Sequence, residues 1–299
     1  MLTWTASGSV PVPTTVQIRV QRSYPGRIRA GAPEPTRSMS QAEIERNLTH
    51  FTEGLRTPRT TPCHTVVWSG IGVATRPDLG PLVDHARAVG LRTVVLHAGI
   101  EDLEGLSVAA WQGRIDRLVV PMQPGGALTG ALQVLASARA AGLPVSTNTV
   151  LTQNALPELA ATARALAAAR PDDVTFTYPF PVNGDDATNA PPPLRAVAAL
   201  HDAWTALDAA GVPASVKGLP ACFLGPDAHR LRRSQNRWYV DADHQCEKAL
   251  LFFPDVVAFH KDESCRFCTA TDRCDGFFAT YLRRPGTPPL RPLEAATGS

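Results

Sequence analysis

Residues 65–97 read TVVWSGIGVATRPDLGPLVDHARAVGLRTVVLH. Two short apolar runs, 65–68 and 93–96, enclose a segment of helical spacing that begins near Pro77 and ends at Gly90. Proline is favoured in the first turn of a helix and glycine just after the last turn. The stretch therefore predicts a strand–helix–strand unit. Its nearly continuous apolar strands are typical of a parallel sheet covered on both faces.

The same alternation continues along the chain. The other predicted strands and helices follow one another as strands 16–21, 117–121, 144–150, 173–178 and 212–216 and helices 128–141, 157–170 and 193–210, with one more helix opening at a capping box, Ser40 to Glu43. About six βα units in succession predict an α/β fold, a partial (β/α)6 TIM-like barrel. No G-x-G-x-x-G motif follows the first strand, so the pattern does not support a dinucleotide site.

Composition and charge exclude several classes of protein. The chain has 299 residues, of which 44% are apolar, so it can bury a full core and is not wholly disordered. No window approaches 18 consecutive apolar residues, and the first residues lack the blocks of a signal peptide, so we expect a cytoplasmic protein without a membrane span. A net charge of +2 gives no electrostatic argument for nucleic acid or membrane partners.

The pattern changes near residue 219, where helical periodicity fades and cysteines begin. We predict four parts: an N-terminal arm (1–14), the partial barrel (15–218), a small Cys-rich C-terminal domain (219–283) and a disordered Pro-rich tail (284–299). The Cys-rich domain also contains a basic run, which reads either as a solvated face or as a docking patch for an acidic partner: Arg230, Arg232, Arg233 and Arg237.

Polar residues stand at the carboxyl ends of the predicted strands, where barrels of this kind carry their chemistry. They are Arg19, Gln21, Ser69, His97, Gln123, Asn148 and Tyr178. We predict the last four as catalytic. At any single position a hydrogen-bonded strand end is the commoner explanation, and the argument rests on the ring of residues together.

Five of the six cysteines fall in the last third of the chain, and only Cys63 stands apart. In a cytosolic chain such a group indicates a metal or iron–sulfur site rather than disulfides. Three closely spaced thiols can share one ion or cluster: Cys265, Cys268 and Cys274. For the fourth ligand we favour Cys222, with Cys246 as the alternative. Spacing alone fits both a [4Fe–4S] cluster and a four-cysteine zinc site.

Two segments resemble the radical S-adenosylmethionine (SAM) superfamily. The stretch from Ser69-Gly-Ile-Gly72 through Arg-Pro-Asp-Leu79 is similar to the region after the family's second strand, and 265–276 resembles the C-x2-C-x5-C part of its SPASM and twitch extensions. The resemblance implies one [4Fe–4S] cluster in the C-terminal domain, since Phe278 stands where a further ligand would be. It also implies cofactor contacts at Ser69, Gly70 and Gly72.

The defining motif of that superfamily is missing. Its C-x3-C-x2-C loop follows the first strand, and here the three positions hold Ser23, Arg27 and Ala30. Iron–sulfur clusters need thiolates, so the SAM-cleaving cluster is predicted absent. Val73 also replaces the glutamate of the family's G-G-E motif. The loop is either a decayed site or an anion site, for which the candidates are Arg19, Arg27 and Arg29.

The expected function is that of a radical-SAM-like iron–sulfur protein that catalyses a non-radical step of Lewis-acid, lyase or sulfur-transfer type. The setting would be a bacterial specialised-metabolite or peptide-modification pathway, with a small-molecule or peptide substrate. Two alternatives stay open. The chain is a substrate-binding or electron-transfer partner of an active radical SAM enzyme, or it is a binding module stapled by zinc.

Overall fold

The computed structural model describes residues 2–5, 8–10, 13–23, 36–53, 61–123, 128–181 and 189–294. Its main feature is a nine-stranded sheet in the order β11-β10-β9-β8-β7-β6-β3-β12-β13. Every neighbouring pair is parallel except β12 and β13. The strands are β3 (Thr15–Arg19), β6 (Thr65–Ser69), β7 (Thr93–His97), β8 (Arg117–Pro121), β9 (Val145–Val150), β10 (Asp173–Thr177), β11 (Ala214–Lys217), β12 (Trp238–Val240) and β13 (Leu250–Leu251).

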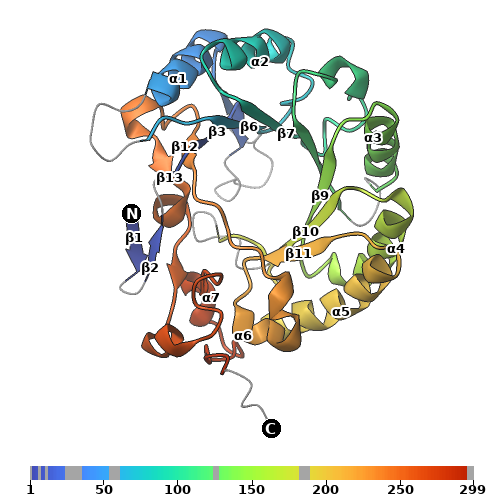
Figure 1. Cartoon of the computed structure of the whole chain (residues 1–299), viewed down its shortest axis with the longest axis vertical. Coiled ribbons are helices and arrows are strands. Elements are labelled where there is room, and N and C mark those ends of the chain that lie inside the picture. Colours follow the sequence, from blue (N-terminus) through green and yellow to red (C-terminus); the bar gives the residue numbers. More distant parts are fainter. Residues whose placement is uncertain are drawn as a thin grey trace, which may run out of the picture.

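Helices connect the strands and lie on the outside of the curved sheet, while the strands line its inner side (Figure 1). The five long helices are α1 (Gln41–Glu53), α2 (Leu79–Ala88), α3 (Leu128–Ala140), α4 (Leu159–Ala169) and α5 (Pro193–Ala209). These elements confirm the predicted α/β partial barrel, whose sheet does not close. None of the helices in the described ranges is long and apolar enough to cross a membrane.

Alternation along the strands separates the core from the interior of the barrel. Val66, Trp68, Val94 and Leu96 have no exposed surface and belong to the hydrophobic core. This core lies between the sheet and the outer helices. The alternate positions of the same strands point to the other side, because successive side chains of a strand face opposite ways. The interior is therefore lined by every second residue.

The C-terminal segment is joined to the barrel sheet. Trp238–Val240 pairs in parallel with β3, and Leu231 forms a parallel bridge with Val216 of β11. Residues 231–240 therefore run from one edge of the sheet to the other. We predicted that the barrel part ends at residue 218, but the sheet continues beyond it by two strands.

The rest of the C-terminal segment consists of short elements around an aromatic core. They are α6 (Ala221–Leu224), η5 (Gly225–Arg230), η6 (Cys246–Lys248), η7 (Phe252–Val256), β14 (Phe259–His260), η8 (Glu263–Phe267), β15 (Phe277–Phe278) and α7 (Ala279–Leu282). Phe259 stacks on Phe278 at a centroid distance of 4.7 Å. We predicted a disordered tail from residue 284, yet Leu290 is buried and the Leu293 carbonyl accepts the Thr269 N–H. As far as residue 294, the tail packs on this region.

Candidate functional site

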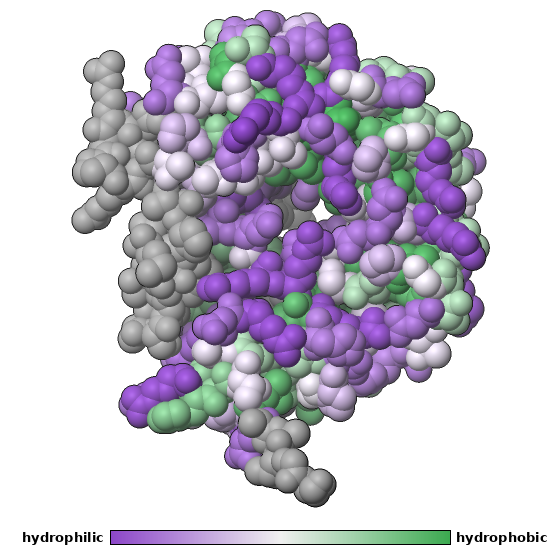
Figure 2. Space-filling model, in the orientation of Figure 1, coloured by the Kyte–Doolittle hydropathy of each residue, from purple (hydrophilic) through white to green (hydrophobic). Residues whose placement is uncertain are grey.

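The interior of the barrel is polar. The inward positions near the carboxyl ends of the strands include Arg19, Ser69, His97, Asn148, Thr177 and Lys217. Several of them bond to each other or to a neighbouring strand. The Gln17 amide donates to Ser69 Oγ at 2.7 Å, and Thr177 Oγ1 donates to Asn148 Oδ1 at 2.7 Å. Figure 2 shows hydrophilic residues gathered around a hollow near the centre of the visible face.

His97 faces this interior from the end of β7. Its side chain is exposed to the solvent that fills the barrel interior. Burial lowers the pKa of His97, and the charges of Arg237 and Lys217 lower it further. Lys217 ends β11, and Arg237 lies in the segment that runs from β11 to β12. A lowered pKa favours the neutral imidazole, which can form hydrogen bonds with a bound molecule through its two ring nitrogens.

Two interior cations, Lys217 and Arg237, were not predicted for the interior: Lys217 was not selected, and Arg237 was placed only in the basic run of the Cys-rich domain. Burial, followed by the charges of Arg232 and Arg237, lowers the pKa of Lys217 to about 8. Arg237 precedes β12, and its guanidinium lies 4.1 Å above the ring of Phe252. Its Nε atom is buried and has no hydrogen-bond partner among the described residues. The position of Lys217 at the end of the last barrel strand was a signal available in the sequence.

Arg19 is the one predicted anion-binding residue that the described part of the chain contains. Its guanidinium donates to the Tyr239 hydroxyl at 3.2 Å, across the β3–β12 pair. Arg27 and Arg29 lie outside the described residues. With Arg19, Lys217 and Arg237 on its walls, the interior favours a ligand of negative charge.

A second constellation is formed by four cysteines that line one cavity. Cys222, Cys265, Cys268 and Cys274 share it with two basic side chains, Lys261 and Arg291. Backbone N–H groups point at the sulfurs: those of Ala221 and Gly276 donate to Cys274 Sγ at 3.4 and 3.3 Å, and that of Leu293 donates to Cys268 Sγ at 3.3 Å. Such hydrogen bonds stabilise thiolates and tune iron–sulfur clusters.

The sequence left two metal sites open for these cysteines, a [4Fe–4S] cluster and a four-cysteine zinc site, and four cysteines that line one cavity suit either of them. Burial raises the pKa of the Cys222, Cys265 and Cys274 thiols, which a bound metal would deprotonate.

Comparison with known proteins gives a fold but no close relative. No protein family and no curated protein matches the chain. Among solved structures, anSMEcpe with bound AdoMet is 11% identical, with a TM-score of 0.57 over 94% of this chain and 93% of its own. Streptococcus suis SuiB bound to S-adenosylmethionine is 12% identical, with a TM-score of 0.55 over 92% of this chain and 76% of its own. The chain has a radical-SAM-like fold. At these identities the likeness concerns the fold alone.

The loop after β6 holds Gly70 and Gly72, two residues for which we predicted cofactor contacts. Gly70 has φ +120°, and a Cβ there would lie 2.8 Å from the Gln21 carbonyl oxygen, so glycine is required. Gly72 also has positive φ, and its N–H donates to Glu101 Oε1 at 3.1 Å. Glu101, which the sequence analysis missed, thus brings a carboxylate to the loop that contains Gly72 and Val73.

Asp102, beside Glu101, also binds the loop after β6. It is fully buried and accepts the N–H groups of Gly99 at 2.7 Å and Ala74 at 3.2 Å. Burial raises the pKa of Asp102. The two acidic residues after β7 therefore tie the β6 and β7 loops together at the mouth of the barrel.

One predicted catalytic residue does not join the others in the interior. Tyr178 is buried on the other side, where its ring packs against Phe277 and Tyr281 and its hydroxyl donates to the Pro191 carbonyl. Gln123 lies two residues beyond the end of β8 and is exposed, like His97. Cys246, the alternative fourth ligand, does not line the cysteine cavity.

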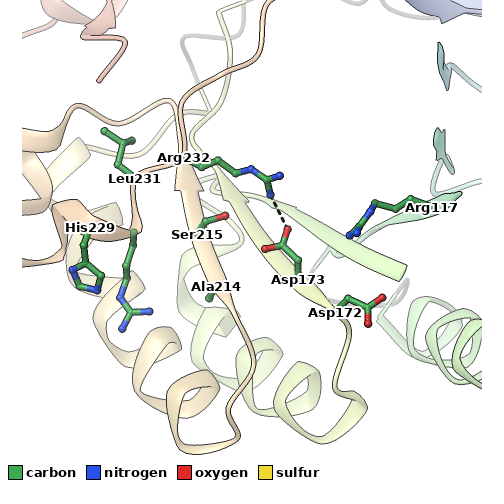
Figure 3. Close-up of a pocket in the computed structure, with 9 residues that line it drawn as sticks. Arg117, Asp172, Asp173, Ala214, Ser215, His229, Leu231 and Arg232 are labelled. Carbon is green, nitrogen blue, oxygen red and sulfur yellow. Dashed lines mark hydrogen bonds and ion pairs between the residues drawn. The ribbon is translucent and has the colours of Figure 1, made fainter. Parts of the chain in front are cut away.

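A cleft of about 580 Å³ opens at the amino ends of β8, β10 and β11 (Figure 3). Arg232 pairs with Asp173 at 2.9 Å, and Arg117 extends from β8 toward Asp172 and Asp173. Arg230 pairs with Asp208 at 2.6 Å. Arg230, Arg232 and Arg233 of the C-terminal basic run are thus held in ion pairs, although the Arg232 side chain stays about half exposed, and Arg237 is directed inward.

Proposed function

We propose that this protein is an iron–sulfur enzyme that processes an anionic substrate in the barrel interior by a non-radical step. The observation that carries the proposal is the convergence of Cys222, Cys265, Cys268 and Cys274 on one cavity with N–H donors to sulfur. In addition, the sequence has Ser23, Arg27 and Ala30 where the SAM-cleaving loop of the superfamily carries cysteines.

The four cysteines would hold one [4Fe–4S] cluster. A cluster with four thiolates supplies electron transfer or a structural link, and it has no iron left open for a substrate. Lys261 and Arg291, which line the same cavity, offset the negative charge of the thiolates. The cluster is therefore assigned to stability or electron transfer, and the substrate chemistry to the barrel interior.

The interior residues support the substrate class and the reaction type. Arg19, Lys217 and Arg237 bind and orient a carboxylate or phosphate group. Neutral His97 would hydrogen-bond the substrate, and the Lys217 amine, with a pKa of about 8, is the group that can give or take a proton near neutral pH. These roles fit a lyase-type step on a small molecule or peptide in a bacterial biosynthetic pathway.

The first experiment measures metal and sulfide in anaerobically purified protein. We expect one [4Fe–4S] cluster per chain in the wild type and its loss in Cys222→Ala. Cys246→Ala is the matched control and should keep the cluster. Zinc in place of iron would contradict the cluster, and an unchanged cluster in Cys222→Ala would contradict the ligand set. Reductive cleavage of added SAM would contradict the non-radical assignment.

The second experiment tests the interior with citrate and pyrophosphate as probe anions. Binding, followed by calorimetry, should weaken at least about tenfold in Lys217→Met, because a buried charge-assisted contact is lost. The exposed Lys248 provides the control substitution, Lys248→Met, which should bind both anions like the wild type. Equal affinity of all three proteins would refute an anionic substrate in the interior.

The absence of the three loop cysteines also favours a second candidate, a partner subunit of an active radical SAM enzyme. The two candidates differ in what the isolated chain can do. Turnover by the chain alone, abolished in His97→Gln with the cluster retained, supports the enzyme. Turnover that begins only when an active radical SAM enzyme is added supports the partner subunit.

A further inference from the structure

A second group of metal-ligating side chains lies apart from the cysteine cavity. His50 is in the last turn of α1, and Cys246 and Glu247 open η6. A ring nitrogen of His50, the sulfur of Cys246 and a carboxylate oxygen of Glu247 all lie within 4.8 Å of one another. His50 is far from Cys246 and Glu247 in the sequence, so the fold of the chain brings the three together.

The surrounding hydrogen bonds fix η6 on α1. Asn47 is fully buried, and its side-chain oxygen accepts the Cys246 N–H at 2.8 Å while its amide donates to Gln245 Oε1 at 3.2 Å. The Gln245 amide donates to Glu43 Oε1 at 3.0 Å. These hydrogen bonds hold η6 against α1 and keep the Cys246 thiol next to His50.

The backbone of Cys246 is strained. Its φ is +50°, in the left-handed region that residues with a Cβ rarely adopt. Among the described residues only Arg170 shares this property, and Arg170 has the ordinary role of a helix C-cap. At Cys246 the hydrogen bond to Asn47 maintains the strained conformation, and in this conformation the thiol lies near His50.

His50 supplies an independent sign of a missing partner. Only 17% of its side chain is exposed. Nδ1 lies 3.8 Å from Glu247 Oε1, and Nε2 is buried with no hydrogen-bond partner among the residues that the structure describes. A buried polar nitrogen without a partner is costly, so native structures seldom keep one without a reason.

We propose that His50, Cys246 and Glu247 bind one zinc ion, separately from the four-cysteine cluster. Imidazole nitrogen, thiolate sulfur and carboxylate oxygen are the three donor types that zinc takes in proteins, whereas calcium and magnesium select oxygen. The thiolate and the carboxylate together balance the charge of Zn²⁺, and the thiol proton passes to solvent on binding. Three protein ligands leave the fourth position to water, on the side where Glu247 is 81% exposed.

The test uses the full chain, purified anaerobically with its cluster and titrated with zinc. X-ray absorption at the zinc edge should show one sulfur at about 2.3 Å and nitrogen or oxygen ligands at about 2.0 Å. Zinc in the cysteine cavity would instead show a shell of four sulfurs, so this result overturns the proposal whatever the outcome for the cluster. Cobalt(II) titration should give the visible bands of a tetrahedral ion with a thiolate ligand.

Variants complete the test. Cys246→Ala and His50→Gln should each weaken zinc binding at least about 100-fold. Glu247→Gln changes an exposed residue and keeps the assay valid if the other two variants fail to fold. His64→Gln, at an exposed histidine outside the group, is the control that should bind zinc like the wild type. Equal zinc affinity in wild type, Cys246→Ala and Glu247→Gln would overturn the proposal.

Discussion

Gly276 links the fold of the C-terminal segment to the cysteine cavity, and its replacement by alanine has a calculable cost. Its φ of +87° would cost an alanine about 1–2 kcal/mol. A Cβ at this position would also lie 2.1 Å from the His260 carbonyl oxygen. That oxygen belongs to the backbone of β14, which pairs with β15, so the clash is relieved only by moving a paired strand. The Gly276 N–H bond to Cys274 Sγ would be disturbed as well.

We therefore expect Gly276→Ala to lower the free energy of unfolding by at least about 3 kcal/mol and to reduce the cluster content. Gly211→Ala is the matched control: Gly211 also has positive φ, but a Cβ there meets nothing within 4 Å, so its cost should be about 1 kcal/mol. Urea unfolding and iron analysis measure both effects. Equal costs for the two substitutions would refute the assignment of a rigid contact between Gly276 and β14.

Three further substitutions test titrating or strained groups. Folding lowers the pKa of Lys217 from 10.5 to about 8, so between these two pH values the unfolded chain binds a proton that the folded chain does not. The free energy of unfolding of the wild type should therefore rise from pH 8 to pH 10.5. Lys217→Met should remove this rise, as measured by the midpoints of urea unfolding. Hydrogen bonds from Gln245 and Ser40 lower the pKa of Glu43 from 4.5 to about 2, so the advantage of the wild type over Glu43→Gln should be full above pH 4.5 and vanish toward pH 2. Cys246→Gly should stabilise the zinc-free protein by about 1 kcal/mol, because glycine accepts φ +50° without strain; a loss of stability would contradict that account.

The strands of the barrel could be predicted because they are short runs rich in apolar residues, although only their alternate positions are fully buried. All seven predicted strands coincide with β3 and β6–β11 to within a few residues. β12 gave no such signal, since Trp238-Tyr-Val240 is only three residues long and is a strand because β3 lies beside it. Its pairing is a tertiary effect, which no local pattern contains.

The interior residues could be predicted only in part, for reasons of strand geometry. Alternation places Thr177 inward, so the next residue, Tyr178, faces the opposite way and packs in the C-terminal core. Counting the same alternation on β11 would have selected Lys217. Arg237 could not be found in this way, because it enters the interior from the segment that spans the edges of the sheet.

The segment 231–240 also connects the proposed cluster site with the proposed substrate site in the barrel interior. Asp275, next to Cys274, is buried, and its carboxylate accepts the Arg233 guanidinium at 2.9 Å and the Ser234 N–H at 2.7 Å. Residues 233 and 234 lie between Arg232, which pairs with Asp173, and Arg237, which faces the interior. A metal that orders the Cys274 loop therefore also orders the segment that supplies cations to the interior. Loss of the cluster should weaken anion binding even though the anion never touches it, and this coupling gives a reason why a chain without the SAM-cleaving motif would keep four cysteines.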